Sequence, residues 1–146
     1  MAINADISRF SRRRRRDGRE NVAKTLEDGS RVAVIGAGPS GSVSSALLHK
    51  KGYRVLVLEK EHFPRFSIGE SLLPQSMEFL EQADMLRAVE GAGFQYKNGA
   101  AFSRADLYES FDFRDKFSEG YGTTLQVQRD RFDKVLADES ERHGVE

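Results

Sequence analysis

The fold is decided by residues 32–41, Val-Ala-Val-Ile-Gly-Ala-Gly-Pro-Ser-Gly. An unbroken apolar run that ends in glycine is typical of a strand buried on both faces of a parallel sheet. Pro39 suits the first turn of a helix, because the N–H group that it lacks would be unpaired there. Gly52 marks the end of this helix, and a second apolar run at 55–58 predicts another strand. Strand, helix and strand within about 30 residues form a βαβ unit, which places the chain in the α/β class.

Three glycines after the first predicted strand follow the pattern GxGxxG. Gly36 permits a tight turn, Gly38 lets the backbone approach a pyrophosphate, and Gly41 lets the helix pack closely on the strand. Pro39 and Ser40 stand at the start of the helix, where unpaired N–H groups and the positive end of the helix dipole favour phosphate. The turn therefore predicts a dinucleotide site.

Glu59 follows the second predicted strand, 23 residues after Gly36. A carboxylate at the end of that strand can accept hydrogen bonds from both hydroxyls of an adenosine ribose. The alternative is a glycine-rich turn that binds no ligand. Strand, glycines, helix, strand and terminal acid all stand in register, which favours a dinucleotide and leaves NAD and FAD undecided.

The composition is that of an ordinary globular domain. The chain has 146 residues, 38% of them hydrophobic, and its 23 basic residues balance 23 acidic ones. Zero net charge argues against a nucleic-acid partner, and no apolar run approaches the about 20 residues of a membrane span. Cysteine is absent and the three histidines stand apart, so we predict no disulfide, no metal site and a cytoplasmic protein.

Residues 1–30 differ from the rest of the chain. Eight basic against five acidic residues give this segment a net charge of +3, with five arginines in a row at Arg12 to Arg16. Such a run among glycine, aspartate and serine predicts a disordered basic arm, and a nucleic-acid or targeting patch is the alternative. No apolar segment follows the arginines as a twin-arginine export signal requires. We therefore divide the chain into this arm and a domain over 31–146.

The segment after Glu59 narrows the choice of cofactor. Residues 63–74 read Phe-Pro-Arg-Phe-Ser-Ile-Gly-Glu-Ser-Leu-Leu-Pro. This segment resembles that of the flavin-dependent halogenases, especially the branch that acts on phenols and pyrroles, and the resemblance runs from about Val32 to the C-terminus. It implies the N-terminal part of a Rossmann-like FAD-binding domain, followed by helices and a β-rich insertion, within a two-domain flavin monooxygenase fold.

The same resemblance implies further contacts with FAD. The backbone of Gly69, Glu70 and Ser71 is expected beside the flavin ring. The two polar side chains there can also serve to cap a helix that opens at Pro74. Arg65 either contacts the cofactor phosphate or pairs with a carboxylate, and the sequence leaves both interpretations open.

Lys97, in the setting Lys-Asn-Gly-Ala, resembles the catalytic lysine of the family. These enzymes use reduced FAD, oxygen and halide to make hypohalous acid, which the lysine directs at an aromatic or pyrrole substrate, free or bound to a carrier protein. A separate flavin reductase supplies the reduced FAD. Arg129, in Gln-Val-Gln-Arg, resembles an arginine that lies near the cofactor. Without the resemblance, these two residues would be an ordinary solvated lysine and a surface arginine.

Local patterns predict the remaining elements. Alternation over 101–108 predicts strands, and Phe111, Phe113 and Phe117 are expected to pack in the core rather than to hold a substrate. Gly144 is expected to end a last helix. Helix caps are expected at Asp84, Asp130 and Asp133. Helical periodicity predicts buried positions at Val43, Ala46, Leu47, Met77, Leu80, Ala83, Leu86, Val89, Phe132, Val135 and Leu136.

Several features of the family are not present in this sequence. In the family, Gly144 leads into a third parallel strand, which is followed by a Gly-Asp motif and a tryptophan-rich GWxWxIP motif. The chain has no tryptophan. We therefore expect an incomplete sheet and an N-terminal fragment, a truncated reading frame or one piece of a longer enzyme. The alternatives are a related flavin hydroxylase or reductase and a non-catalytic remnant.

Overall fold

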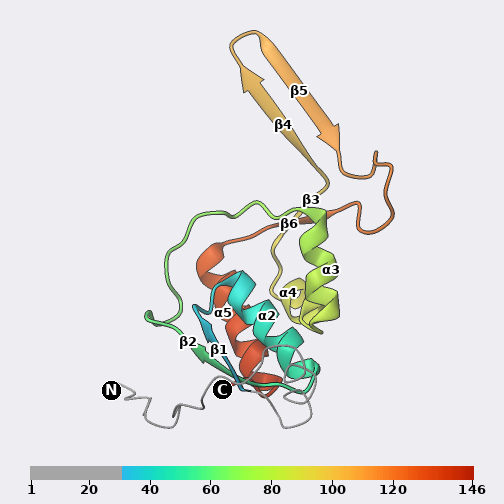
Figure 1. Ribbon diagram of the computed structural model, residues 1–146. Helices are drawn as coiled ribbons and strands as arrows, with labels where there is room; N and C mark the ends of the chain where they lie inside the picture. The colour runs from blue at the N-terminus through green and yellow to red at the C-terminus, as the bar shows by residue number, and fades with distance from the viewer. Residues whose placement is uncertain (1–30) are drawn as a thin grey trace, which may run out of the picture. The chain divides into compact units, whose positions relative to one another are not determined.

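The computed structural model describes residues 31–146, and the predicted arm over residues 1–30 lies outside them. A strand–helix–strand unit comes first, then two short helices, antiparallel strands and a last helix (Figure 1). No helix in the described part is long and apolar enough to cross a membrane. The elements are β1 (Arg31–Ile35), α2 (Pro39–Lys50), β2 (Arg54–Leu58), α3 (Pro74–Gln82), α4 (Leu86–Gly91), β3 (Gln95–Lys97), β4 (Gly99–Arg104), β5 (Leu107–Asp112), β6 (Thr124–Gln126) and α5 (Arg129–Arg142).

The predicted βαβ unit is confirmed. β1 and β2 pair in parallel, with Val32 opposite Val55, and α2 connects them. The helix begins at Pro39 as expected. It ends before Gly52, whose φ of +90° lies in the left-handed region that glycine adopts without strain. The fold class is therefore α/β.

Both strands are more exposed than the sequence predicts. Ile35 is 88% exposed, and Val55 is the one buried residue of β1 and β2. The reason is that α2 packs on this two-stranded sheet and no other described element does. The prediction of strands buried on both faces is wrong for the part of the chain that the structure describes.

The outer edge of β2 pairs with the last residue of the sequence. Glu146 donates its N–H to the Val55 carbonyl (3.0 Å) and accepts from the Val57 N–H (2.6 Å). Slanted bonds of this kind are those of a parallel pair. The contact agrees with the third parallel strand that the resemblance implies after Gly144.

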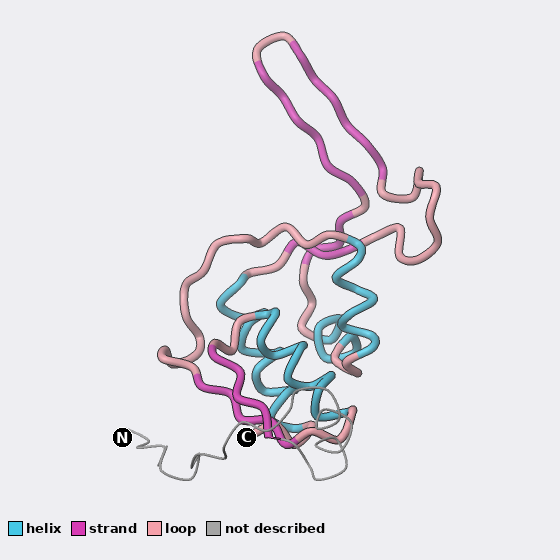
Figure 2. Tube along the Cα trace, in the orientation of Figure 1, coloured by secondary structure: helices cyan, strands magenta, loops and turns pink. Residues whose placement is uncertain are grey.

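The hydrophobic core lies among the helices, which Figure 2 shows grouped on one side of β1 and β2. α2 packs on α5, α3 packs on α2, and α4 packs on α5. The predicted apolar positions of α3, α4 and α5 are confirmed, with Leu86 and Val135 partly buried at the border. The buried members of the core are Ala46, Met77, Leu80, Ala83, Met85, Val89, Leu125, Val127, Phe132 and Leu136.

α2 meets α5 through hydroxyl groups that the apolar pattern did not identify. Ser42 and Ser45 are buried, whereas Val43 and Leu47 are only partly buried. The hydroxyl oxygen of Ser45 lies 2.9 Å from that of Ser140 on α5, and both side chains are buried. Because serine counts as polar in a hydropathy pattern, this close helix contact was not predictable from periodicity.

The N-cap residues of α3, α4 and α5 make no side-chain cap hydrogen bond, so the caps predicted at Ser71, Asp84 and Asp133 are wrong. Asp130 does bond to a first-turn N–H group of α5, that of the next residue (2.7 Å). Asp84 accepts a hydrogen bond from Lys50 Nζ (2.6 Å). Ser71 and Asp133 contact cationic side chains of the candidate site.

β4 and β5 form a hairpin closed by residues 105–106. It contacts no other described element, and Figure 1 shows it extending away from the helices. Phe102 and Phe111 stack on each other there, yet both are more than half exposed. Among the aromatic residues expected in the core, Phe113 is buried, whereas Phe111 and Phe117 are exposed. Phe111 contacts the Phe102 and Phe113 rings, but no other described element covers the hairpin.

Candidate functional site

The glycine turn between β1 and α2 has the backbone geometry of a phosphate loop. Gly36 has a φ of +96°, and its N–H donates to the carbonyl of Leu58 at the end of β2 (2.7 Å). A Cβ atom on Gly41 would lie 1.9 Å from the carbonyl oxygen of Gly36. The turn therefore requires glycine at both positions, at one for its conformation and at the other for the close approach of α2.

The first turn of α2 offers donors to a ligand. Gly38 is the N-cap residue, and no side chain bonds to this end of the helix. The N–H groups of Ser40 and Gly41 have no acceptor within the helix, and Pro39 has no N–H group. Unpaired N–H groups and the positive end of the helix dipole attract phosphate oxygens, so this end of α2 fits a pyrophosphate.

Glu59 lies at the carboxyl end of β2 and reaches the glycine turn. Its Oε2 accepts from the Ala37 N–H (2.8 Å) and its Oε1 from the Glu61 N–H (3.1 Å). Partial burial by itself would raise the pKa of Glu59, but these N–H groups and the Arg65 guanidinium outweigh burial and lower the pKa below its ordinary value. The carboxylate is thus ionised, and each oxygen keeps a lone pair for a ribose hydroxyl.

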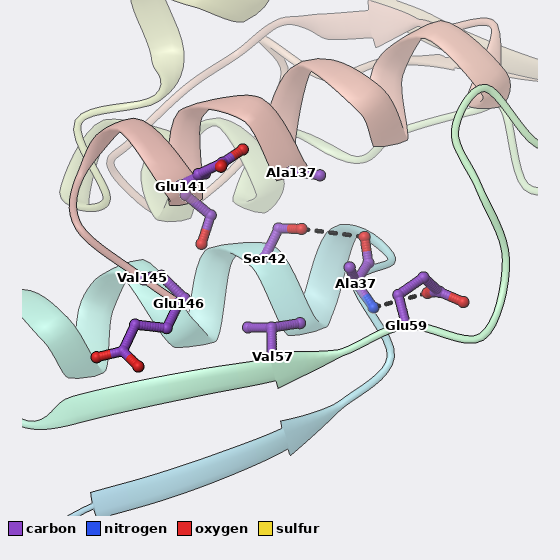
Figure 3. Close-up of a pocket in the computed structure, with 9 residues that line it drawn as sticks. Ala37, Ser42, Val57, Glu59, Ala137, Glu141, Val145 and Glu146 are labelled. Atoms are coloured by element: carbon purple, nitrogen blue, oxygen red, sulfur yellow. Dashed lines mark hydrogen bonds between the residues drawn. The ribbon is translucent and has the colours of Figure 1, made fainter. Parts of the chain in front are cut away.

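Figure 3 shows how Ala37 is fixed between two side chains. Its N–H points at Glu59, and its carbonyl accepts the hydroxyl of Ser42 on α2 (3.0 Å). A small hollow of about 220 Å³ lies beside this arrangement, between α2, β2 and α5, bordered by Val57 and Glu146. Because Ala37 is held through both its N–H and its carbonyl, the turn presents its remaining N–H groups in a fixed direction.

A larger hollow of about 570 Å³ opens where β1 and β2 end. Ligands of open α/β sheets bind at the carboxyl ends of the strands. Apolar Ile35 and Leu58 beside the Glu59 carboxylate suit an adenosine, which has a flat base and a polar ribose. The lining residues are Ile35, Gly36, Leu58, Glu59, Lys60, Glu61 and Arg65.

The position of Arg65 agrees with both interpretations that the sequence left open, a carboxylate partner and a phosphate contact. Its Nη2 is 3.6 Å from a Glu59 oxygen and 3.5 Å from an Asp133 oxygen, and its guanidinium lies 5.1 Å from the centre of the Phe63 ring. It makes no hydrogen bond within the described residues, and its buried Nε has no partner there. A Cβ atom on Gly38 would lie 3.3 Å from Nη2, so Arg65 also reaches the turn that fits the pyrophosphate.

Arg129, at the start of α5, is mostly buried, with its side chain 14% exposed. Its Nε and Nη2 donate to the two carboxylate oxygens of Asp133 (2.7 and 3.0 Å). Its Nη1 donates to the carbonyl of Ile68 and lies 3.5 Å from that of Gly69. This role of Asp133 was not predicted, although an arginine and an acid four residues apart on one helix are a recognisable signal.

The segment over 69–71 is tied to β6. Gly69 has a φ of +96°, and a Cβ atom there would lie 3.0 Å from Arg129 Nη1. The carbonyl of Glu70 accepts the N–H of Val127 (2.8 Å), and Ser71 forms an isolated bridge with β6. The backbone expected beside the flavin ring is therefore held against β6 through Glu70 and Ser71.

Lys97, the candidate catalytic residue, ends β3 next to this segment. Its Nζ donates to the Ser71 hydroxyl and lies 3.5 Å from the Leu72 carbonyl oxygen. The amine is also 5.1 Å from the centre of the Phe113 ring. The structure thus brings Lys97 to the Gly-Glu-Ser segment, 26 residues earlier in the chain.

The fold and the glycine turn define an α/β dinucleotide-binding protein. A family model described as FAD binding domain matches residues 29–146. The chain therefore belongs to the FAD-binding domain family. The choice between NAD and FAD, which the glycine pattern left open, is resolved as FAD, and the expected cofactor is confirmed.

Relatives of known activity include two halogenases. The tryptophan 2-halogenase of Chondromyces crocatus is 34% identical over 120 residues, which are 82% of this chain and 22% of that protein. The 1H-pyrrole-2-carbonyl-(peptidyl-carrier protein) brominase of Pseudoalteromonas luteoviolacea is 36% identical over 115 residues, 79% of this chain and 27% of the brominase. The chain thus spans about a quarter of the length of these relatives.

Solved structures give the same result. A flavoprotein/dehydrogenase from Cytophaga hutchinsonii has a TM-score of 0.76 and 51% sequence identity, over 80% of this chain and 29% of that one. The myxobacterial chondrochloren halogenase has a TM-score of 0.70 and 38% identity, over 80% of this chain and 27% of that one. The predicted resemblance to flavin-dependent halogenases and the predicted fold class are both confirmed.

Proposed function

We propose that this chain is the FAD-binding portion of a flavin-dependent halogenase, which uses reduced FAD, oxygen and halide to halogenate an aromatic or pyrrole substrate. The observation that carries the proposal is the position of Lys97, whose amine contacts Ser71 and Leu72 of the Gly-Glu-Ser segment. The two relatives described above are named for tryptophan and for a pyrrole on a carrier protein. The substrate is an electron-rich ring, free or bound to a carrier protein.

The described residues fit both halves of FAD. The glycine turn, the first N–H groups of α2, Glu59 and Arg65 would hold the adenosine and the pyrophosphate. The backbone of 69–71, with Arg129 behind it, would lie beside the flavin ring. When bound, reduced FAD would supply the two electrons that reduce oxygen to the peroxide level, and this oxidising equivalent would convert halide to hypohalous acid.

Lys97 directs the oxidant. Its ammonium group has three N–H donors, and Ser71 and Leu72 accept two of them. The third donor holds hypohalous acid by a hydrogen bond and orients it toward the substrate ring. The ring carbon gains the halogen and loses its proton, which leaves with the hydroxide as water. A haloamine on the same nitrogen is the alternative form of the oxidant.

The remaining partners follow from the resemblance and the composition. A separate flavin reductase supplies reduced FAD. The enzyme binds substrate, halide and oxygen in the cytoplasm. Residues 31–146 are a partial FAD-binding domain, which a basic segment over 1–30 precedes.

Replacing Lys97 in the enzyme that carries this segment tests the function. Lys97→Ala should abolish halogenated product while oxygen still reoxidises the flavin, because other residues build the flavin site. Mass spectrometry of the product and stopped-flow absorbance of the flavin measure the two quantities. Lys134→Ala, which removes a lysine paired with Asp138 on α5, is the control and should change neither. Near-normal halogenation by Lys97→Ala would contradict the proposal.

A flavin hydroxylase or reductase that makes no hypohalous acid is the second candidate. It is favoured by the 51% identity to the structure described as a flavoprotein/dehydrogenase. A hydroxylated product, formed at the same rate with and without halide, would identify this alternative.

A further inference from the structure

Four charged side chains of alternating sign form a row behind the glycine turn and the 68–69 segment. Glu59 Oε2 lies 3.6 Å from Arg65 Nη2, and the same nitrogen lies 3.5 Å from Asp133 Oδ2. Asp133 in turn accepts two hydrogen bonds from Arg129 (2.7 and 3.0 Å). The row therefore runs from Glu59, the acid expected to bind the ribose, to Arg129, which contacts the 68–69 carbonyls.

Burial makes Asp133 the centre of this row. Its side chain is fully buried, whereas those of Glu59, Arg65 and Arg129 are 14–17% exposed. A buried carboxylate is costly unless cations pair with it, and here one arginine lies on each side. Removal of Asp133 would leave Arg129 without its two side-chain acceptors and Arg65 with acids on one side only.

Arg65 is the member of the row with free donors. Its neighbours Glu59, Glu61 and Asp133 lie at 3.5–3.8 Å, beyond the geometry of a strong hydrogen bond, and no described residue accepts from it. Its Nη2 lies beside Gly38 in the glycine turn. A guanidinium in this state can turn its N–H groups to phosphate oxygens without breaking an existing hydrogen bond.

We propose that Asp133 is a positioning residue of the FAD site. It draws Arg65 away from Glu59 and Glu61, so that the guanidinium stands at the pyrophosphate turn, and it orients Arg129 on the carbonyls of 68–69. Asp133 itself does not touch the cofactor. The inference rests on FAD binding and not on the proposed halogenation.

The test compares ligand affinities in the full chain with and without the acid. Asp133→Asn should weaken ADP binding about tenfold, the value of one lost charge-assisted interaction, and should weaken FAD binding further because Arg129 is also released. Calorimetric titration about 15 °C or more below the thermal midpoint of each variant separates affinity from stability. This interval is about twice the usual shift in midpoint that one mutation causes. Asp138→Asn is the matched control, because Asp138 is an exposed acid of the same helix, paired with a lysine four residues earlier.

Arg65→Gln is the second variant, because it leaves the Arg129–Asp133 pair in place and keeps the test decisive if Asp133→Asn does not fold. Arg65→Gln should also weaken ADP binding. In the double variant, Asp133→Asn should weaken ADP binding by less than about a further twofold, since both changes remove the same interaction. ADP affinity unchanged in Arg65→Gln would overturn the proposal. So would a lower midpoint with unchanged affinities in Asp133→Asn. A chain that binds FAD as described, in an enzyme that makes no halogenated product, would overturn the proposed function alone.

Discussion

At the scale of single residues, two glycines of the same turn have different tasks. A Cβ atom on Gly41 would collide with the backbone of Gly36, whereas one on Gly38 would meet only the tip of the Arg65 side chain at 3.3 Å. Gly41→Ala should therefore lower the free energy of unfolding by about 1–3 kcal/mol, the usual cost of overpacking. Gly38→Ala should leave stability nearly unchanged.

The two variants should both bind ADP poorly. In Gly38→Ala the methyl group takes the space that the pyrophosphate needs, so we expect about tenfold weaker binding at unchanged stability. Urea denaturation and calorimetric titration measure the two effects. A stable Gly38→Ala variant with normal ADP affinity would mean that the pyrophosphate does not approach this glycine.

Glu59 should make ADP binding depend on pH. Its pKa is lower in the folded chain than its ordinary value of 4.5, so the carboxylate is ionised at neutral pH and its contribution is present above that value. The contribution should be lost as the pH falls below 4.5 through the lowered pKa. Titrations from pH 8 down to about pH 3 should show this loss in the wild type and not in Glu59→Gln, which should bind about tenfold more weakly at pH 7. Equal pH profiles would contradict the assignment.

Residues of the local βαβ pattern were predictable, whereas the roles of Ser71 and Asp133 as partners of charged side chains were not. The glycines and Glu59 belong to one local βαβ pattern, which fixes their places. Ser71 and Asp133 look like helix caps locally. Their partners Lys97 and Arg65 come from other segments, and a charged partner outweighs a cap.

At the scale of elements, the helices carry the stability and the hairpin does not. Leu136 of α5 is fully buried in the core, whereas Phe102 of β4 is 64% exposed on a hairpin that contacts no other described element. Leu136→Ala should lower the free energy of unfolding by about 2–5 kcal/mol, and Phe102→Ala should change it by less than about 0.5 kcal/mol. Urea denaturation measures both. A large loss in Phe102→Ala would show that the hairpin packs on a surface of the chain.

Element types and the buried faces of the helices followed from hydrophobic period, but the burial of the strands did not. The period of α3, α4 and α5 identified their core faces, because a helix buries the same stripe in any context. The apolar runs of β1 and β2 predicted full burial, which depends on neighbours that the described residues do not supply. Phe111 and Phe117 were predicted to be buried and are exposed for the same reason.

At the scale of the whole molecule, the contacts expected for the nucleotide half of FAD are more complete in this chain than those expected for the flavin ring. We expect residues 1–146 to bind FAD with a Kd above about 1 µM, because affinity depends on contacts made together at both ends of the ligand. Equilibrium dialysis measures the Kd, and ADP should compete with FAD for the site. Submicromolar binding would contradict this expectation.

The serine contact between α2 and α5 has a consequence for motion. The hydroxyl groups of Ser45 and Ser140 are in contact, so the two helices pack closely at this point. Close packing of this kind opposes sliding of one helix along the other. α2 begins at the glycine turn, and α5 carries Asp133 and Arg129 of the row. The two helices should therefore open as one cooperative unit. Amide protons of the two helices should then exchange with solvent at matched rates, and a ligand seated on the turn alone should slow exchange along the whole of α5.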